Sequence, residues 1–345
     1  MSPTRIAVAW IALLWLGGYP RESPLVAQVL AMPPSMAMES LPGQDAGSLL
    51  VGPSDLGLES AAQFPSIPAP GPATAVSTAL AYGGRVDSWE LATEGWVWQS
   101  LPSGLIYRSY LAGGREARLA AQVVHERDAG WLFDATLGGR AGLLRYGSRD
   151  TVQPEGWQLD VEGAAFPRVT LWDERFLVSS DFRGGFPLTF RRGPLEAKFA
   201  FYHLSSHLGD QFMLVTGLPP IDYSRDALVL GLGLRPAESL RLYAEADWAF
   251  HTTGFSDPWQ FQFGAELSSV APTGCGGSPF VAVNGLIRQD VDFAGNLTVQ
   301  AGWQWRGTAG QLLRGGFYYL NGKSDQGQFF REHEELIGMG VWYDF

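Results

Sequence analysis

The residue types that could perform chemistry gather in one short segment, residues 195–210. It contains His203, Ser205 and His207, followed by Asp210. Serine hydroxyls become nucleophiles when a neighbouring base accepts their proton, and histidine is the commonest such base. His203 and Ser205 are two residues apart, so on a β-strand their side chains project to the same side. The segment could therefore place a base and a nucleophile on one face.

The surrounding elements must be β-strands, because from about residue 113 polar and apolar residues alternate. In the segment 239–251, Leu240, Leu242 and Ala244 alternate with Arg241 and Tyr243. A period of two is the signature of a strand with one apolar face. In a soluble sandwich these apolar faces would form a shared core, whereas in a transmembrane barrel they would face lipid.

Three observations favour the barrel. The segments are roughly 10–14 residues long, which suits tilted membrane strands better than the usual 5–6 residues of soluble ones. Aromatic residues such as Trp131, Trp157 and Trp259 stand at segment ends, where interfacial girdles require them. The chain also ends on Phe345, and Ile337, Met339, Val341 and Tyr343 share its face. This ending resembles the C-terminal signal of bacterial outer-membrane barrels, which implies that the insertion machinery of that membrane reads the last strand.

About twelve such segments can be counted, which predicts an antiparallel barrel of about twelve strands with both ends on the periplasmic side. The segments lie near 116–125, 131–145, 156–169, 175–190, 195–206, 223–235, 239–251, 259–269, 279–291, 296–306, 311–321 and 334–345. Short connections at Gly193, 236–238 and 307–310 would be periplasmic, and longer ones near 207–222 and 322–333 extracellular.

The composition agrees with a membrane β-protein and excludes several other classes. Charged residues are 17% of the chain and aromatic residues 13%, against a usual charged fraction of about 25%. The net charge of −11 argues against nucleic-acid binding through a basic surface. A single cysteine excludes an internal disulfide framework and a multi-cysteine zinc site.

The N-terminal third divides into two parts. Residues 1–27 contain Arg5 and then an apolar run of about a dozen residues, which predicts a secretion signal peptide. Residues 28–97 are rich in Pro, Ala, Ser and Gly and predict a flexible, disordered linker. Residues 98–345 would then be the barrel domain. Whether residues 85–112 form a strand, a plug or an arm stays open.

The His203-x-Ser205 element resembles that of outer membrane phospholipase A, a twelve-stranded barrel, and the active site of the lipid A deacylase barrel. The resemblance implies that His203 is a general base and Ser205 a nucleophile attacking an acyl ester of a membrane lipid. A third member on the next strand would orient the imidazole, and Asp226 has the outward parity and lies nearest the apolar belt. The phospholipase resemblance also implies a Ca²⁺ site, for which Asp210 is the candidate ligand together with Asp222 and Asp226. The residues that follow Ser205 depart from the phospholipase pattern.

A second resemblance covers most of residues 100–345. The runs 157–163, 181–189 and 202–210 are similar to an uncharacterised bacterial outer-membrane family, catalogued as a domain of unknown function. It implies the barrel fold and no activity. Two interpretations therefore stay open: a lipid-acyl hydrolase with its site on the lipid-facing wall, and a non-catalytic structural barrel or narrow pore. In the second, His203 and Ser205 are interfacial groups, and Asp210 is merely solvated.

Overall fold

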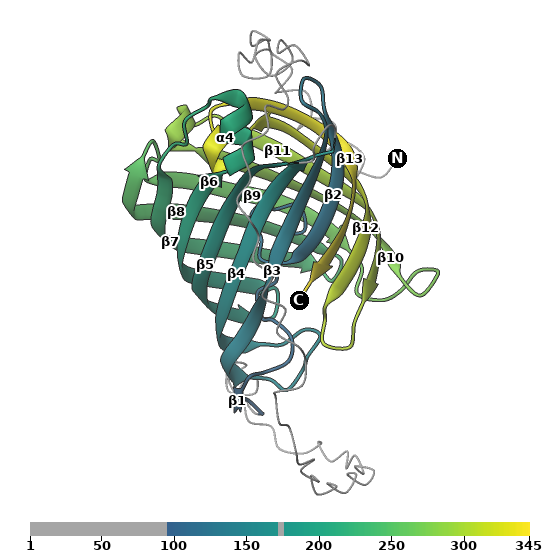
Figure 1. Cartoon of the computed structure of the whole chain (residues 1–345). Coiled ribbons are helices and arrows are strands. Elements are labelled where there is room, and N and C mark those ends of the chain that lie inside the picture. The colour runs from purple at the N-terminus through teal and green to yellow at the C-terminus, as the bar shows by residue number, and fades with distance from the viewer. Residues whose placement is uncertain (1–94, 172–175) are drawn as a thin grey trace, which may run out of the picture. The chain divides into compact units, whose positions relative to one another are not determined.

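The computed structural model describes residues 95–171 and 176–345, and they form a closed antiparallel β-barrel of twelve strands (Figure 1). Each strand from β2 to β13 pairs with the next in chain order, and β13 pairs back with β2. The strands are β2 (Leu119–Glu126), β3 (Gly130–Gly147), β4 (Gly156–Thr170), β5 (Leu177–Arg192), β6 (Leu195–Leu208), β7 (Tyr223–Ala237), β8 (Leu240–Gly254), β9 (Trp259–Ser268), β10 (Ser278–Arg288), β11 (Gly295–Arg306), β12 (Leu312–Lys323) and β13 (His333–Asp344). The predicted fold and strand number are confirmed.

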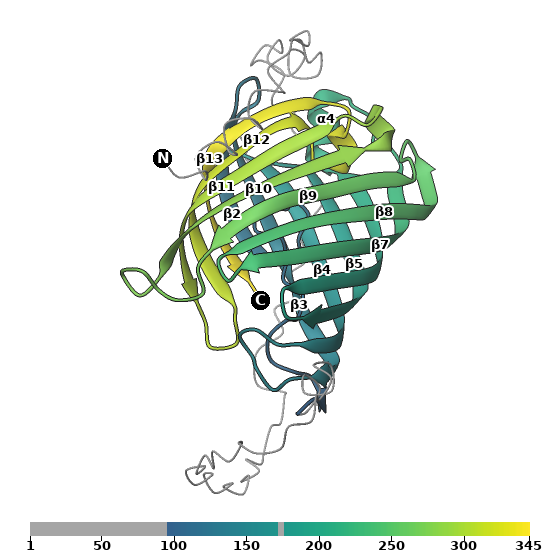
Figure 2. The same ribbon diagram turned by 180° about the vertical axis from the view of Figure 1, so that it is seen from behind.

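The connections differ between the two ends of the barrel, and the views from both sides show this (Figure 1, Figure 2). One end, which we call the helical end, carries α4 (Asp210–Thr216) and the 3₁₀ turns η3 (Gln289–Val291) and η4 (Gly327–Phe329). The other, the C-terminal end, carries Phe345 and the connections 193–194, 238–239 and 307–311. This is the separation predicted for the two sets of loops. No helix among the described residues has the length and apolar character needed to cross a bilayer.

The outward face of the barrel is apolar over most of its circumference. Leu232 on β7 is 60% exposed and Met339 on β13 is 68% exposed, and they belong to a wide set of outward Leu, Phe, Val and Trp side chains. Large contiguous apolar surfaces are unusual on proteins surrounded by water. An apolar band on the outside with polar residues inside is the arrangement of a transmembrane barrel.

The inward faces are charged, and oppositely charged groups pair across the strands. Six charged residues on β5, β6 and β8 share the inward parity of their strands, namely Arg183, Arg191, Lys198, Arg241, Glu245 and Asp247. Arg168 on β4 binds both Asp134 on β3, at 2.7 Å, and Glu334 on β13, at 2.6 Å. Pairing of this kind is required because an unpaired charge in a dry interior is costly.

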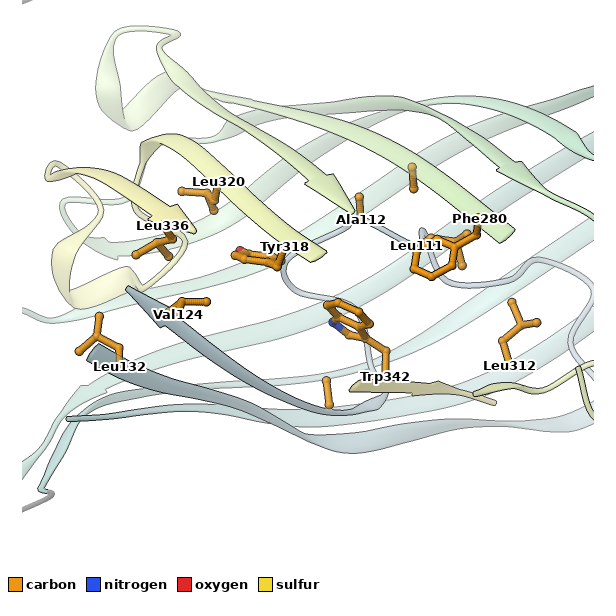
Figure 3. Packing of buried hydrophobic residues seen from close by; sticks show 12 residues of the cluster. Leu111, Ala112, Val124, Leu132, Phe280, Leu312, Tyr318, Leu320, Leu336 and Trp342 are labelled. Atoms are coloured by element: carbon orange, nitrogen blue, oxygen red, sulfur yellow. The ribbon is translucent and has the colours of Figure 1, made fainter. Parts of the chain in front are cut away.

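Residues 97–118 answer the question that the sequence left open for this region. Val97–Ser100 form a short strand, β1, which pairs with the end of β3. Residues 101–118, which we call the inserted segment, contain Tyr110, Leu111 and Ala112, all at most 3% exposed. Figure 3 shows Leu111 and Ala112 among side chains from several strands, including Phe280 and Trp342. The inserted segment is thus part of the packed interior.

Polar contacts also hold the inserted segment in place. The Tyr110 hydroxyl donates to Glu245 Oε2 at 2.8 Å, and the Tyr110 ring stacks on Tyr243 with centroids 3.7 Å apart. Glu266 accepts from the Leu111 backbone N–H at 2.7 Å. The predicted signal peptide 1–27 and almost all of the predicted linker 28–97 lie outside the described residues.

Candidate active site on the outer wall

Successive side chains of strand β6 point alternately into the barrel and out of it. Its burial alternates from end to end, with Glu196, Lys198 and Tyr202 covered inside the barrel. His203, Ser205 and His207 lie on the other parity and point outward, as the alternation predicts. The candidate residues therefore stand on the outer wall, toward the helical end of the strand.

Cross-strand register brings His203 and Asp226 together. They are directly opposite in the β6–β7 pair, where Cβ atoms lie about 4.5–5.5 Å apart. His203 Nδ1 lies 2.7 Å from Asp226 Oδ1, and the two side chains are 53% and 26% exposed. With Nδ1–H donating to the carboxylate, Nε2 carries the lone pair that a general base needs. The predicted contact between these two residues is present.

Ser205 contacts a different histidine from the predicted one. Its Oγ lies 3.3 Å from His207 Nε2, and no hydrogen bond to His203 is formed within the described residues. Side chains two residues apart on a strand stand about 6.6 Å apart at their Cα atoms, so rotamers decide which neighbours meet. Ser205 has a histidine two residues away on either side, His203 and His207. The spacing His-x-Ser-x-His in the sequence therefore already indicated that His207 could contact Ser205.

Next to this group lies a separate hydrogen-bonded chain on β7 and β8. Thr253 Oγ1 donates to Asp222 Oδ1 at 3.0 Å and lies 2.9 Å from Ser224 Oγ. Ser224 is opposite Ser205 in the register, but its hydroxyl is engaged with Thr253. These groups satisfy one another without the histidines.

The residues proposed as calcium ligands do not converge. Asp210 is the first residue of α4, Asp222 accepts from Thr253, and Asp226 is bound by His203. Within residues 95–171 and 176–345, no group of three or more His, Cys, Asp or Glu side chains is placed to hold a metal ion. Calcium prefers six to eight oxygen ligands, so these side chains do not fit it.

Two glycines leave the wall open on the far side of His203. Gly184 on β5 is opposite His203, and Gly163 on β4 is opposite Gly184. A Cβ at either position would meet no atom closer than 3.7 Å. Phe182 and Phe186 flank Gly184 on the same face and are about half exposed. The result is a smooth apolar strip that leads along the wall to the imidazole.

Several solved structures share the barrel at low similarity. Outer membrane phospholipase A from Escherichia coli has a TM-score of 0.43 at 10% identity, covering 66% of this chain and 89% of that chain. The same enzyme from Salmonella typhi, a dimer with bound calcium, has a TM-score of 0.43 at 10% identity, covering 66% and 90%. A KdgM porin has a TM-score of 0.37 at 9% identity, covering 66% and 98%.

The sequence comparisons give a family but no described activity. No curated protein matches the sequence. A family model described as a protein of unknown function, DUF1207, matches residues 72–345, which include every strand of the barrel. The chain belongs to the DUF1207 family.

Proposed function

We propose that this chain is a bacterial outer-membrane barrel in contact with membrane lipids, with its helical end facing the cell exterior. The apolar outer band supports this, as do the aromatic residues at strand ends and the even number of strands. The last strand, which ends on Phe345, is the segment that the insertion machinery would recognise. Its outward residues Ile337, Met339 and Val341 are all at least half exposed.

We further propose that the outer wall hydrolyses an acyl ester of a membrane lipid. The observation that carries this proposal is the His203–Asp226 hydrogen bond beside Ser205, in a polar group at the helical end of an outer wall that is apolar elsewhere. Polar groups on such a face are unfavourable unless they lie near the interface or perform a function. An imidazole oriented by a carboxylate, with a serine two residues along the same face of the strand, provides the three groups that acyl transfer uses.

The reaction follows from these positions. Ser205 Oγ attacks the ester carbonyl carbon while His203 Nε2 accepts the hydroxyl proton. The bond between that carbon and the alcohol oxygen breaks, and His203 returns the proton to the departing alcohol. Water, deprotonated by His203, then attacks the acyl-serine carbonyl. The bond between that carbon and Ser205 Oγ breaks, His203 returns the proton to Oγ, and the fatty acid is released. Asp226 stabilises the imidazolium that forms in each step.

His207 holds the hydroxyl of Ser205 before substrate arrives. Catalytic hydrogen bonds are often long or differently aligned without substrate. Rotation of the Ser205 side chain replaces the hydrogen bond to His207 with one to His203. Of these two histidines, only His203 has a carboxylate hydrogen-bonded to its ring. The open strip at Gly184 gives an acyl chain access to His203 from the β5 side.

Release of fatty acid from phospholipid and from lipid A in mixed micelles tests the proposal. We expect purified wild-type protein to release fatty acid and Ser205→Ala to lose at least about a thousandfold in rate. Ser224→Ala is the matched control, because it removes a hydroxyl from the same face without touching His203. If wild type and Ser205→Ala release fatty acid equally, or neither does, the hydrolase proposal fails and a structural barrel is the better interpretation.

A further inference from the structure

The barrel interior contains an arginine-lined cavity at its C-terminal end, near the position marked C in Figure 1. Its volume is about 30 Å³. Five arginines line it, and we call it the arginine cavity. They are Arg108 of the inserted segment, Arg191 of β5, Arg235 of β7, Arg241 of β8 and Arg306 of β11.

The cavity carries an excess of positive charge. Its lining contains five arginines against two carboxylates, Glu266 and Asp344. Asp344 is also bound by Arg314, at 2.7 Å, and by Arg118, at 3.1 Å, so it is shared with cations outside the cavity. Adding Glu196, which pairs with Arg235 and Arg241, still leaves five arginines against three carboxylates. In a chain with a net charge of −11, this is a local concentration of cations.

Some of these arginines have donors with no acceptor. Nε and Nη1 of Arg306 are buried and lack a hydrogen-bond partner among the described residues, as does Nη2 of Arg241. The Arg241 side chain is only 2% exposed. Buried polar atoms are nearly always hydrogen-bonded, and an orphaned guanidinium donor requires a partner such as an unseen ion or water.

Arg108 adds another positive charge, and among the described residues it forms no ion pair with a carboxylate. Its guanidinium donates to the backbone carbonyl of Val152, a neutral group. Burial, together with the like charges of Arg306 and Arg235, holds the pKa of Arg108 well below its usual range. Packing like charges in a poorly solvated space is unfavourable unless an opposite charge joins them.

We propose that the arginine cavity binds a small oxyanion of the phosphate class, held by the unpaired donors of Arg306 and Arg241. Arginine presents its N–H groups in a fork that matches tetrahedral oxyanions. The cavity is small, at about 30 Å³, and holds only a few water-sized groups, so the ligand is a small inorganic anion and a nucleotide is excluded. The lining side chains belong to inward faces, so the ligand is a free anion and not a lipid headgroup. Bound there, it would tie the inserted segment to β8 and β11.

Thermal unfolding of the intact protein in uncharged detergent micelles tests the proposal. Inorganic phosphate is titrated against chloride at constant ionic strength, so that general screening cancels. We expect a saturable rise in the unfolding temperature with phosphate. Arg306→Gln is the test variant. Within residues 95–171 and 176–345, Arg306 makes only a weak contact with Ser268 Oγ, at 3.5 Å, and no ion pair that its loss would break. It should weaken phosphate binding at least about tenfold.

The control variant is Arg127→Gln, which removes the same charge from an exposed turn at the helical end. It should bind phosphate as wild type does. The proposal is overturned if phosphate stabilises wild type no more than chloride does, or if the two variants change binding equally. A short-chain phosphatidic acid forms the second arm of the experiment. A response to that lipid without any response to inorganic phosphate would also contradict a free-anion site.

Discussion

Replacing Asp226 tests how the candidate site works, and the structure gives the size of the effect. Asp226 Oδ1 lies 2.7 Å from His203 Nδ1. A hydrogen bond to a charged group contributes about 1.5–3 kcal/mol, and one between neutral groups about 0.5–1.5 kcal/mol. Asn keeps one acceptor oxygen and loses the charge, so Asp226→Asn should cost the difference, about 1–1.5 kcal/mol. At 1.36 kcal/mol per factor of ten, kcat falls about 5- to 13-fold.

Truncation to Ala removes the whole interaction. Asp226→Ala should therefore lower kcat about 13- to 160-fold, and kcat should fall in the order Asp226, Asp226→Asn, Asp226→Ala. KM should change little, because Asp226 contacts the base and not the substrate. The assay is the initial rate of fatty-acid release from phospholipid micelles over a range of substrate concentrations.

The matched control is Asp222→Asn, which makes the same change on the same face of the chain but at a carboxylate bound to Thr253. It should leave kcat within about twofold of wild type. The effect of Asp226→Asn should also vanish in a His203→Ala background, because the two residues act as one unit. Equal losses in the two Asn variants, or a larger loss in His207→Ala than in His203→Ala, would refute the assignment of His203 as the oriented base.

Three further predictions concern the barrel and its wall. Arg168→Met leaves Glu334, which is buried, and Asp134, which is partly buried, without their cation. It should lower the free energy of unfolding by about 3–5 kcal/mol in denaturant titrations, whereas Arg127→Met in an exposed turn should change it little. Similar values for both variants would contradict the ion-pair argument. Tyr110→Phe keeps the ring stack on Tyr243 but loses the hydrogen bond from the hydroxyl to Glu245. The free energy of unfolding should fall by about 1–2 kcal/mol in the same titration. An unchanged midpoint would show that this hydrogen bond does not stabilise the inserted segment. Gly184→Leu should change the free energy of unfolding little, because a Cβ at this outward position meets only the Glu162 carbonyl oxygen, at 3.9 Å. It should raise KM for lipid, because the side chain covers the approach to His203. An unaltered KM would show that substrate does not reach His203 along this strip.

The register across strands explains why part of the site was predictable and part was not. Parity along β6 and β7 places His203 and Asp226 on the outer face, and the next-strand position of Asp226 is visible in the sequence. Parity does not say which histidine Ser205 contacts, because both stand two residues away. That choice depends on rotamers and on neighbours such as Phe182, whose ring lies edge-on to His207 with centroids 5.6 Å apart.

The position of the inserted segment could not be predicted from alternation along the chain. For residues 85–112 the sequence left open a strand, a plug or an arm, and most of the inserted segment falls in this range. The position of the segment rests on contacts across long stretches of chain, such as Tyr110 with Glu245, 135 residues apart. The arginine cavity was equally hidden, since its five arginines come from the inserted segment and four different strands.

The sequence by itself determined the twelve strands, their two faces and the ends at which the connections 193–194, 238–239 and 307–311 and the segments 209–222 and 324–332 lie. It could do so because a strand repeats every two residues, and a wall with lipid outside and charge inside imposes that repeat on every strand. The tertiary structure contains the contact between Asp226 and His203 that strand parity predicted, and it alone decided that Ser205 meets His207 and that residues 101–118 enter the barrel. Those outcomes depend on which side chains the closed barrel brings within a few ångströms of one another, and neither spacing nor composition records such distances.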